Sequence, residues 1–215
     1  MNKVGNTFPG GSSTNSTTSS TVELVLEPPD EFEGPGLSVS LWSRPRHLPH
    51  YNAAHEIQMI TYRLSDSLPK AVIQRKADEM LPDAEPAYRK RIESQLDLCH
   101  GSCVLRDPLY ARMVIDTWRH FDGDRYHLVA WVVMPNHVHV MIRMNGTASL
   151  PRIVQSWKSY TGRQLPVSWQ REYWDRFIRD EKHYHQAIAY IEQNPVNAGL
   201  CQAAELWCWS SAFKG

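Results

Sequence analysis

The sequence lacks the features of a membrane or secreted protein. It contains no apolar run of about 18 residues, the length that a membrane-spanning helix needs, and its N-terminus has no apolar core of the kind found in a secretion signal. Cysteine is scarce, with four in 215 residues. Cys99 and Cys103 offer half a zinc site at most, so structural or incidental cysteines are favoured, with zinc as the alternative. We expect a protein of the reducing cytoplasm without a membrane partner.

An excess of charge is also missing, because 23 basic residues balance 23 acidic ones. The distribution is uneven, however: residues 1–43 carry a net charge of −4, which leaves +4 on the remainder. Five basic residues and no acidic residue lie between Arg143 and Arg171, where Trp157, Tyr160 and Trp169 also occur. Basic residues interleaved with aromatic ones suit phosphates and stacked bases, although a solvated helix face with ordinary core tryptophans would give the same pattern.

The chain divides into a tail and one domain. Residues 1–21 are rich in Ser, Thr, Asn and Gly, and residues 22–43 are acidic and punctuated by Pro and Gly. Neither stretch has the periodic apolar residues that a core requires, so we predict a disordered acidic tail over 1–43 and a folded domain over 44–215.

Within the domain, strand and helix patterns alternate. The expected strands are 56–64, 126–134, the run after the Pro135–Asn136 turn, and 174–179; the expected helices are 70–80, 85–99, 107–121, 149–160 and 181–193, the last ended by Pro195. This order predicts an α+β fold with a ferredoxin-like antiparallel sheet, helices on one face of that sheet, and additional inserted helices.

The most informative pattern is a pair of histidines at alternate positions of an apolar strand. His137 and His139 share one face of that strand, with Cα atoms about 6.8 Å apart, so both rings could approach one metal ion. A satisfied core pair, a sheet-edge pair or a hydrogen-bond network would give the same spacing.

A phenol and an amide are similarly paired on the last helix. Tyr190 and Asn194 are four residues apart and therefore lie on one helix face. Taken alone, Tyr190 is more often a packing residue than a nucleophile, and Asn194 before Pro195 fits a helix C-terminus. Two imidazoles, an amide oxygen and a phenol together are suited to metal-assisted attack of tyrosine on a phosphodiester.

The conjunction of motifs resembles the REP-associated tyrosine transposases, which are single-tyrosine HUH transposases. The similar blocks follow in the family's order and extend over about residues 44–212: they are 47–50, 61–69, 134–140, 156–160, 174–179, 190–199 and 209–211. The resemblance implies that Tyr190 is the nucleophile and that His137, His139 and Asn194 hold a divalent ion, Mg or Mn. Gln193 competes with Asn194 for the third position, but the i+4 spacing favours Asn194.

The resemblance also implies an activity and a substrate. Tyr190 would cleave single-stranded DNA beside a hairpin of the repetitive extragenic type, form a 5′-phosphotyrosine bond, and rejoin the strand in the cytoplasm at the nucleoid. Arg143, Arg152, Lys158 and Arg163 would contact phosphates, while Trp157 or Tyr160 could stack on a base or pack in the core. No ATP is expected, because the sequence has no phosphate-binding G-x-x-x-x-G-K-[ST] loop.

Three other functions fit parts of the pattern. The main alternative is a DNA-hairpin-binding protein that has lost cleavage. Replication initiators and relaxases share the chemistry but have larger domains, and a metal-dependent hydrolase would need a carboxylate base near the ion. The sequence leaves open whether the protein acts as a monomer or a homodimer.

Overall fold

The computed structural model describes residues 42–43, 50–51, 56–72, 85–146 and 148–215. Most of the predicted tail and residues 73–80 of a predicted helix lie outside this part of the chain. Two residues assigned to the tail form strand β1 (Trp42–Ser43), which pairs antiparallel with β2 (His50–Tyr51). Paired strand residues therefore occur just before residue 44. No described helix has the length and apolar character needed to cross a membrane.

A four-stranded antiparallel sheet forms the centre of the molecule. Its strands are β3 (Ile57–Arg63), β4 (Tyr126–Val133), β5 (His137–Met144) and β6 (Trp174–Phe177). They lie in the order β4-β5-β3-β6, which is the strand order of a ferredoxin-like sheet. The predicted α+β class and antiparallel sheet are confirmed.

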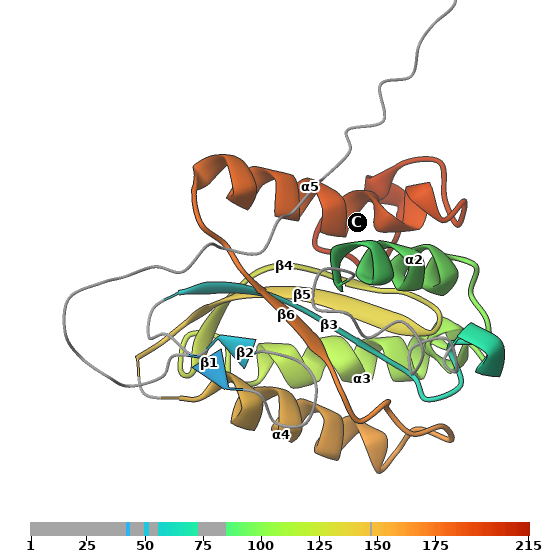
Figure 1. The fold of residues 1–215 in the computed structure, drawn as a ribbon, viewed down its shortest axis with the longest axis horizontal. Coiled ribbons are helices and arrows are strands. Elements are labelled where there is room, and N and C mark those ends of the chain that lie inside the picture. Colours follow the sequence, from blue (N-terminus) through green and yellow to red (C-terminus); the bar gives the residue numbers. More distant parts are fainter. Residues whose placement is uncertain (1–41, 44–49, 52–55, 73–84, 147) are drawn as a thin grey trace, which may run out of the picture.

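Two helices form the crossover connections of this sheet. Helix α3 (Pro108–Arg119) begins at Asp107, whose side chain accepts a hydrogen bond from the Leu109 N–H, and proline occupies its first turn as expected. Helix α4 (Leu150–Gly162) follows β5. Both helices lie on one face of the sheet (Figure 1), where their buried residues join those of β3, β4 and β5 in the larger core cluster.

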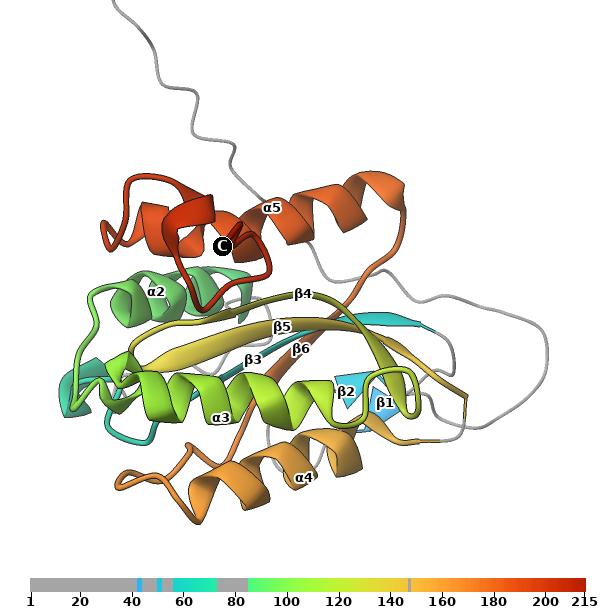
Figure 2. The same cartoon turned by 180° about the vertical axis from the view of Figure 1, so that it is seen from behind.

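The prediction that helices cover one face is wrong for two further helices. Helix α2 (Glu85–Asp97) and helix α5 (Glu181–Asn197) lie on the opposite face, as both views show (Figures 1 and 2). The reason is the sheet itself: Met59, Val132 and Met141 are apolar residues on that second face and need cover, which Ala187 and Ile191 of α5 provide.

The last helix is longer than predicted, because Pro195 does not end it. Helix α5 begins after the Asp180 cap, which accepts from the His183 N–H, and continues through Pro195 to Asn197. A proline removes one backbone donor, and here the loss falls in the final turn, where the Ala198 N–H still bonds to the Asn194 carbonyl at 3.0 Å. Asn194 is therefore an interior helical residue one turn after Tyr190.

A register shift in β4 changes which residues face α5. Leu128 pairs with Ile142 and Ala130 pairs with Met141, so Val129 is the extra residue of a β-bulge. Before the bulge, Tyr126 and Leu128 face the α3/α4 side; after it, Ala130 and Val132 face α5. The small Ala130 thus lies under the helix.

Candidate active site

Both histidines point to the face that α2 and α5 cover. In the β3–β5 register His137 pairs with Arg63 and His139 with Thr61, beside Met141 opposite Met59. The imidazoles are almost fully buried, and their Nε2 atoms lie 3.1 Å apart. The alternation predicted from sequence is correct, and it brings two ring nitrogens to one point.

The other ring nitrogens are fixed by neighbours. Asn136 donates from Nδ2 to the His100 carbonyl, which orients its amide so that Oδ1 faces His137 Nδ1 at 2.8 Å. An amide oxygen only accepts, so His137 Nδ1 carries the hydrogen and its Nε2 carries the lone pair, which faces His139 Nε2. His139 Nδ1 lies 2.8 Å from Thr61 Oγ1, an arrangement typical of ligands whose outer nitrogen is held by a second group.

Both imidazoles are neutral. Burial lowers the pKa of His139 to about 3, and the charge of Arg176 acts in the same direction. Burial, then His139 and Arg63, hold the pKa of His137 well below its ordinary value. Neutral imidazole is the form that binds a metal ion.

Tyr190 lies directly against this pair. Its ring centroid is 5.4 Å from that of His139, with an interplanar angle of 74°. Burial raises the pKa of the phenol well above its ordinary value; Glu93 and Asp97 raise it further, while Arg176 opposes them. The Glu93 carboxylate thus acts on the phenol from helix α2. The structure therefore brings together the phenol and the imidazoles that the sequence analysis singled out.

Asn194 has an uncommitted oxygen. The residue is 2% exposed, and its Oδ1 has no hydrogen-bond partner among the described residues. Leaving a buried acceptor without a partner costs roughly 1–3 kcal/mol, so such an atom is a candidate ligand. Gln193, its competitor, is exposed.

The donor set fits a divalent metal ion. Within the described ranges no three His, Cys, Asp or Glu residues form a metal-binding group, so two imidazoles need a third ligand of another type. The orphaned Asn194 oxygen is of that type. Imidazole ligands favour Zn or Mn, whereas an amide oxygen suits Mg or Mn. His137, His139 and Asn194 are the residues that would hold the ion.

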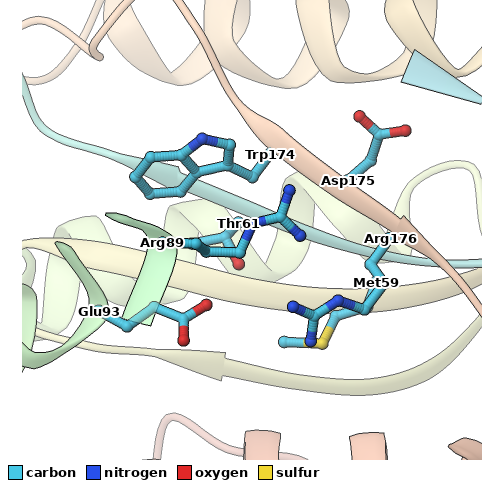
Figure 3. Close-up of a pocket in the computed structure, with 7 residues that line it drawn as sticks. All are labelled: Met59, Thr61, Arg89, Glu93, Trp174, Asp175 and Arg176. Atoms are coloured by element: carbon cyan, nitrogen blue, oxygen red, sulfur yellow. The ribbon is translucent and has the colours of Figure 1, made fainter. Parts of the chain in front are cut away.

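Sequence reasoning missed a polar hollow beside Tyr190. It lies between α2, β3 and β6 (Figure 3) and has a cavity volume of about 10 Å³; its lining residues are Met59, Thr61, Arg89, Glu93, Trp174, Asp175 and Arg176. Glu93 and Thr61 connect it to the candidate site, through Tyr190 and His139 respectively. Desolvation, with the charge of Arg89, lowers the pKa of the Arg176 guanidinium to about 10, against the opposing charge of Glu93.

A sequence signal existed for part of this hollow. Trp174 and Arg176 alternate on β6, and they pair with Thr61 and Met59, so both belong to the site face. Glu93 gave no local signal, because its place depends on where the inserted helix α2 packs.

The four predicted DNA-contact residues are not gathered together. Arg143 is exposed at the end of β5, whereas Arg152, Lys158 and Arg163 belong to α4 or its C-terminus, beyond the opposite face of the sheet. Lys158 donates to the carbonyls of Gln170 and Arg171 at 2.6 and 2.7 Å. Of the two candidate stacking residues on α4, Trp157 is fully buried in the core and Tyr160 is 57% exposed.

Glu192 and the four cysteines bear on the hydrolase and zinc alternatives considered from the sequence. The Glu192 carboxylate, which neighbours Tyr190 on α5, accepts a hydrogen bond from Ser211 Oγ at 3.0 Å. All four cysteines are free, and they form no metal-binding group with other described residues.

Known proteins resemble the chain at the site and in the fold. Residues 118–194, which include both histidines, Tyr190 and Asn194, match the family described as "Transposase IS200 like". A Haemophilus influenzae protein, provisionally described as a REP-associated tyrosine transposase, is 29% identical over 41% of this chain and 60% of its own length. An uncharacterized protein of the same organism is 32% identical over 31% of this chain and 52% of its own length. The chain thus spans little more than half the length of these curated relatives.

A solved structure has the same fold. It is described as a REP-associated tyrosine transposase bound to a REP hairpin, and it superposes with a TM-score of 0.50 at 18% identity over 79% of this chain and 82% of that one. The family resemblance expected from the sequence motifs is confirmed by these matches.

Proposed function

Starting from the similarity of residues 118–194 to IS200-like transposases, we propose that the protein is a metal-dependent transesterase that cleaves and rejoins single-stranded DNA at hairpins. The observation that carries the proposal is the contact between the Tyr190 ring and His139, whose Nε2 converges with that of His137. A nucleophile beside a pair of neutral metal ligands is the arrangement that attack on a phosphodiester needs.

In the proposed reaction, the Tyr190 oxygen attacks the phosphorus in line with the bond to the 3′ oxygen. A 5′-phosphotyrosine bond forms and the 3′-hydroxyl end leaves, so the bond energy is kept for rejoining. A bound divalent ion would neutralise the charge that develops on the phosphate. His137, His139 and Asn194 would hold that ion, and the apolar cover of α5 would limit attack by water on the covalent intermediate.

The substrate class follows from the relatives. The structural neighbour is described as bound to a REP hairpin, and we extend hairpin DNA with an unpaired flank to this chain. Tyr190 and the histidines contact each other within one chain, which supports cleavage by a single protomer without exchange of helix α5.

The test is a covalent-adduct assay with a labelled hairpin oligonucleotide and Mn²⁺, read on a denaturing gel. We expect an adduct from the native protein and none from Tyr190→Phe. Tyr184→Phe, on the same helix, is the control and should keep the adduct. Cleavage without an adduct would indicate a hydrolase, and a mobility shift without cleavage would indicate a hairpin-binding protein; either result would contradict the proposal.

A further inference from the structure

The C-terminal segment, residues 207–211, returns from α5 to the sheet and covers the edge of β4. The Val133 N–H donates to the Trp209 carbonyl at 2.8 Å. The Ser211 N–H donates to the Trp131 carbonyl at 2.9 Å. Because β4 is the outer strand of the four-stranded sheet, these bonds satisfy backbone groups that would otherwise be unpaired at its edge. In Figure 2 the red segment after α5 can be followed from that helix toward β4.

Ser211 is the residue of this segment that joins β4 to α5. Its hydroxyl oxygen accepts a hydrogen bond from the Trp131 N–H at 3.1 Å. The same oxygen lies 3.0 Å from Glu192 Oε1 and 3.3 Å from the Trp131 carbonyl oxygen. A hydroxyl has one hydrogen to donate. The Trp131 carbonyl already accepts from the Ser211 N–H, and a carboxylate is the stronger acceptor, so the hydrogen goes to Glu192.

Glu192 lies in the turn of α5 that carries the candidate site residues. It follows Tyr190 by two residues and precedes Asn194 by two, so a contact that fixes it also fixes that turn. Toward the sheet this turn is held by the apolar side chain of Ile191, a contact that has little directional preference. Pro195 has no N–H to donate to the Ile191 carbonyl. The hydrogen bond from Ser211 therefore adds a directional constraint where the helix has one backbone bond fewer.

The Ser211 hydroxyl is not needed to keep the segment on β4. Backbone bonds hold the segment there, and the Trp207 indole N–H also donates to the Val133 carbonyl at 3.0 Å. The neighbouring Ser210 uses its hydroxyl within the segment, where it accepts from the Ala212 N–H at 3.1 Å. Removing the Ser211 hydroxyl thus frees α5 while the edge pairing stays, and Ser210 provides a matched control.

We propose that Ser211 is a positioning residue for DNA cleavage. Its hydroxyl holds Glu192 and thereby keeps the Tyr190 phenol and the Asn194 amide against the histidine pair. Ser211 itself touches none of the candidate reacting groups and acts through α5. When α5 is free to shift, the phenol loses its alignment with the phosphorus, and a misplacement of about 1 Å can cost about 10²-fold in rate. The inference rests on the proposed transesterase function and assigns a role to the last of the similar sequence blocks.

The test is the single-turnover rate of adduct formation at saturating Mn²⁺ and saturating hairpin oligonucleotide. In Ser211→Ala we expect the rate to fall by about 10- to 100-fold, while the hairpin Kd from fluorescence anisotropy stays within about threefold of native. Ser211→Thr keeps a hydroxyl and should restore most of the rate. Ser210→Ala should match the native rate within about threefold. A Ser211→Ala rate within that range would overturn the proposal.

A double-mutant cycle tests whether the hydroxyl acts through Glu192. Glu192→Ala should lower the rate about as much as Ser211→Ala does, and the combined variant should be no slower than either single variant, because both remove the same contact. If the two losses multiply, Ser211 and Glu192 act separately, and the proposal is wrong.

A folding defect is distinguished by a second pair of variants. If Ser211→Ala loses its native circular dichroism spectrum, Ser211→Thr and Ser211→Val, which have the same shape, replace it. Threonine should keep more activity than valine, since only threonine can donate to Glu192. Equal rates in these two variants would contradict the proposal.

Hydrogen exchange measures the position of α5 without DNA. By mass spectrometry, the peptide that covers residues 187–194 should exchange its amide hydrogens faster in Ser211→Ala than in Ser210→Ala. Equal exchange would overturn the proposal. No adduct from the native protein would overturn the proposed function and the catalytic part of this inference, whereas the exchange result would still decide whether Ser211 fixes the helix.

Discussion

The two faces of the central sheet are built from the same strands and differ in how completely their polar groups are satisfied. On the α3/α4 face, Trp118 Nε1 donates to the Tyr62 hydroxyl, Trp157 Nε1 donates to the Tyr126 hydroxyl, and that hydroxyl donates to the Trp118 carbonyl. These four large side chains are fully buried. This face combines apolar packing with a closed hydrogen-bond network, and both stabilise the fold.

The α2/α5 face carries groups that reduce stability. His137 and His139 are buried without charge, the Asn194 oxygen has no partner among the described residues, and the pKa values of Tyr190 and Glu93 are raised by desolvation. Alternation along β5 places the two histidines one residue away from Val138 and Val140, which belong to the core cluster. The packing of the α3/α4 face therefore offsets the cost of burying polar groups on the α2/α5 face.

The largest expected effect is on stability, at the α3/α4 face. Trp157→Ala should lower the free energy of unfolding by about 3–5 kcal/mol, because it removes a fully buried aromatic side chain and leaves a cavity. Urea denaturation measures this change. Tyr160→Ala, an exposed aromatic on the same helix, is the control and should change it by less than about 0.5 kcal/mol. Equal effects of the two variants would contradict the assignment of this face as the core.

On the α2/α5 face, His137→Ala should lower the rate of DNA cleavage. We expect adduct formation to fall by about a thousandfold, since loss of a metal ligand removes charge stabilisation of several kcal/mol, while hairpin binding survives. Quantitative adduct gels and anisotropy measure the two properties. His127→Ala, an exposed histidine on β4, should leave both unchanged. Retained cleavage in His137→Ala would show that the histidine pair has no role in the reaction.

A smaller effect is expected from removing the Thr61 hydroxyl, which lies against His139. Thr61→Val keeps the volume but removes the oxygen that lies 2.8 Å from His139 Nδ1, so the Kd for Mn²⁺ should rise by about tenfold to hundredfold. Isothermal titration calorimetry measures the Kd. Thr117→Val, on helix α3, tests the same substitution away from the site. An unchanged Kd in Thr61→Val would argue against ligation through His139 Nε2.

The smallest effect concerns pH. Burial, with the charge of Glu93, raises the pKa of Asp97 to about 6, against about 3.9 in an unfolded chain. The native state then binds this proton more tightly than the unfolded state, so Asp97 lowers stability progressively as pH rises from about 4 to about 6.

Asp97→Asn removes this penalty. After allowance for partial exposure, it should match the native protein at pH 4 and exceed its unfolding free energy by about 1–2 kcal/mol at pH 7. Thermal denaturation across this pH range measures the difference, and Asp116→Asn on the exposed side of α3 is the control. A variant less stable than the native protein at pH 7 would contradict the raised pKa.

Short-range patterns predicted the parts of the site that lie on single elements. The period of two placed His137 and His139 on one face of β5, and the i+4 spacing placed Asn194 one turn from Tyr190. What sequence reasoning missed depends on contacts between distant segments. Glu93 reaches Tyr190 only because α2 packs on the second face, and the carbonyl partners of Lys158 come from a loop twelve residues away.

Two errors in the fold have the same origin. The prediction that Pro195 ends the last helix follows the usual effect of a proline, which breaks helical hydrogen bonds. In the last turn, however, few such bonds remain to be broken. The location of α2 and α5 was not determined by their own sequences, because an amphipathic helix shows which side it buries and not which face of the sheet receives it.

The single additional residue in β4 affects the space between the sheet and helix α5. If Val129 were paired as a regular strand residue, the alternation of the strand would continue unbroken, and Trp131 would occupy the side where Ala130 and Val132 now lie. An indole ring in place of the Val132 side chain, opposite His139, would push helix α5 outward and separate the Tyr190 phenol from the imidazoles. The distance between the Tyr190 phenol and the two imidazoles therefore depends on one inserted residue of β4, which has no polar group of its own.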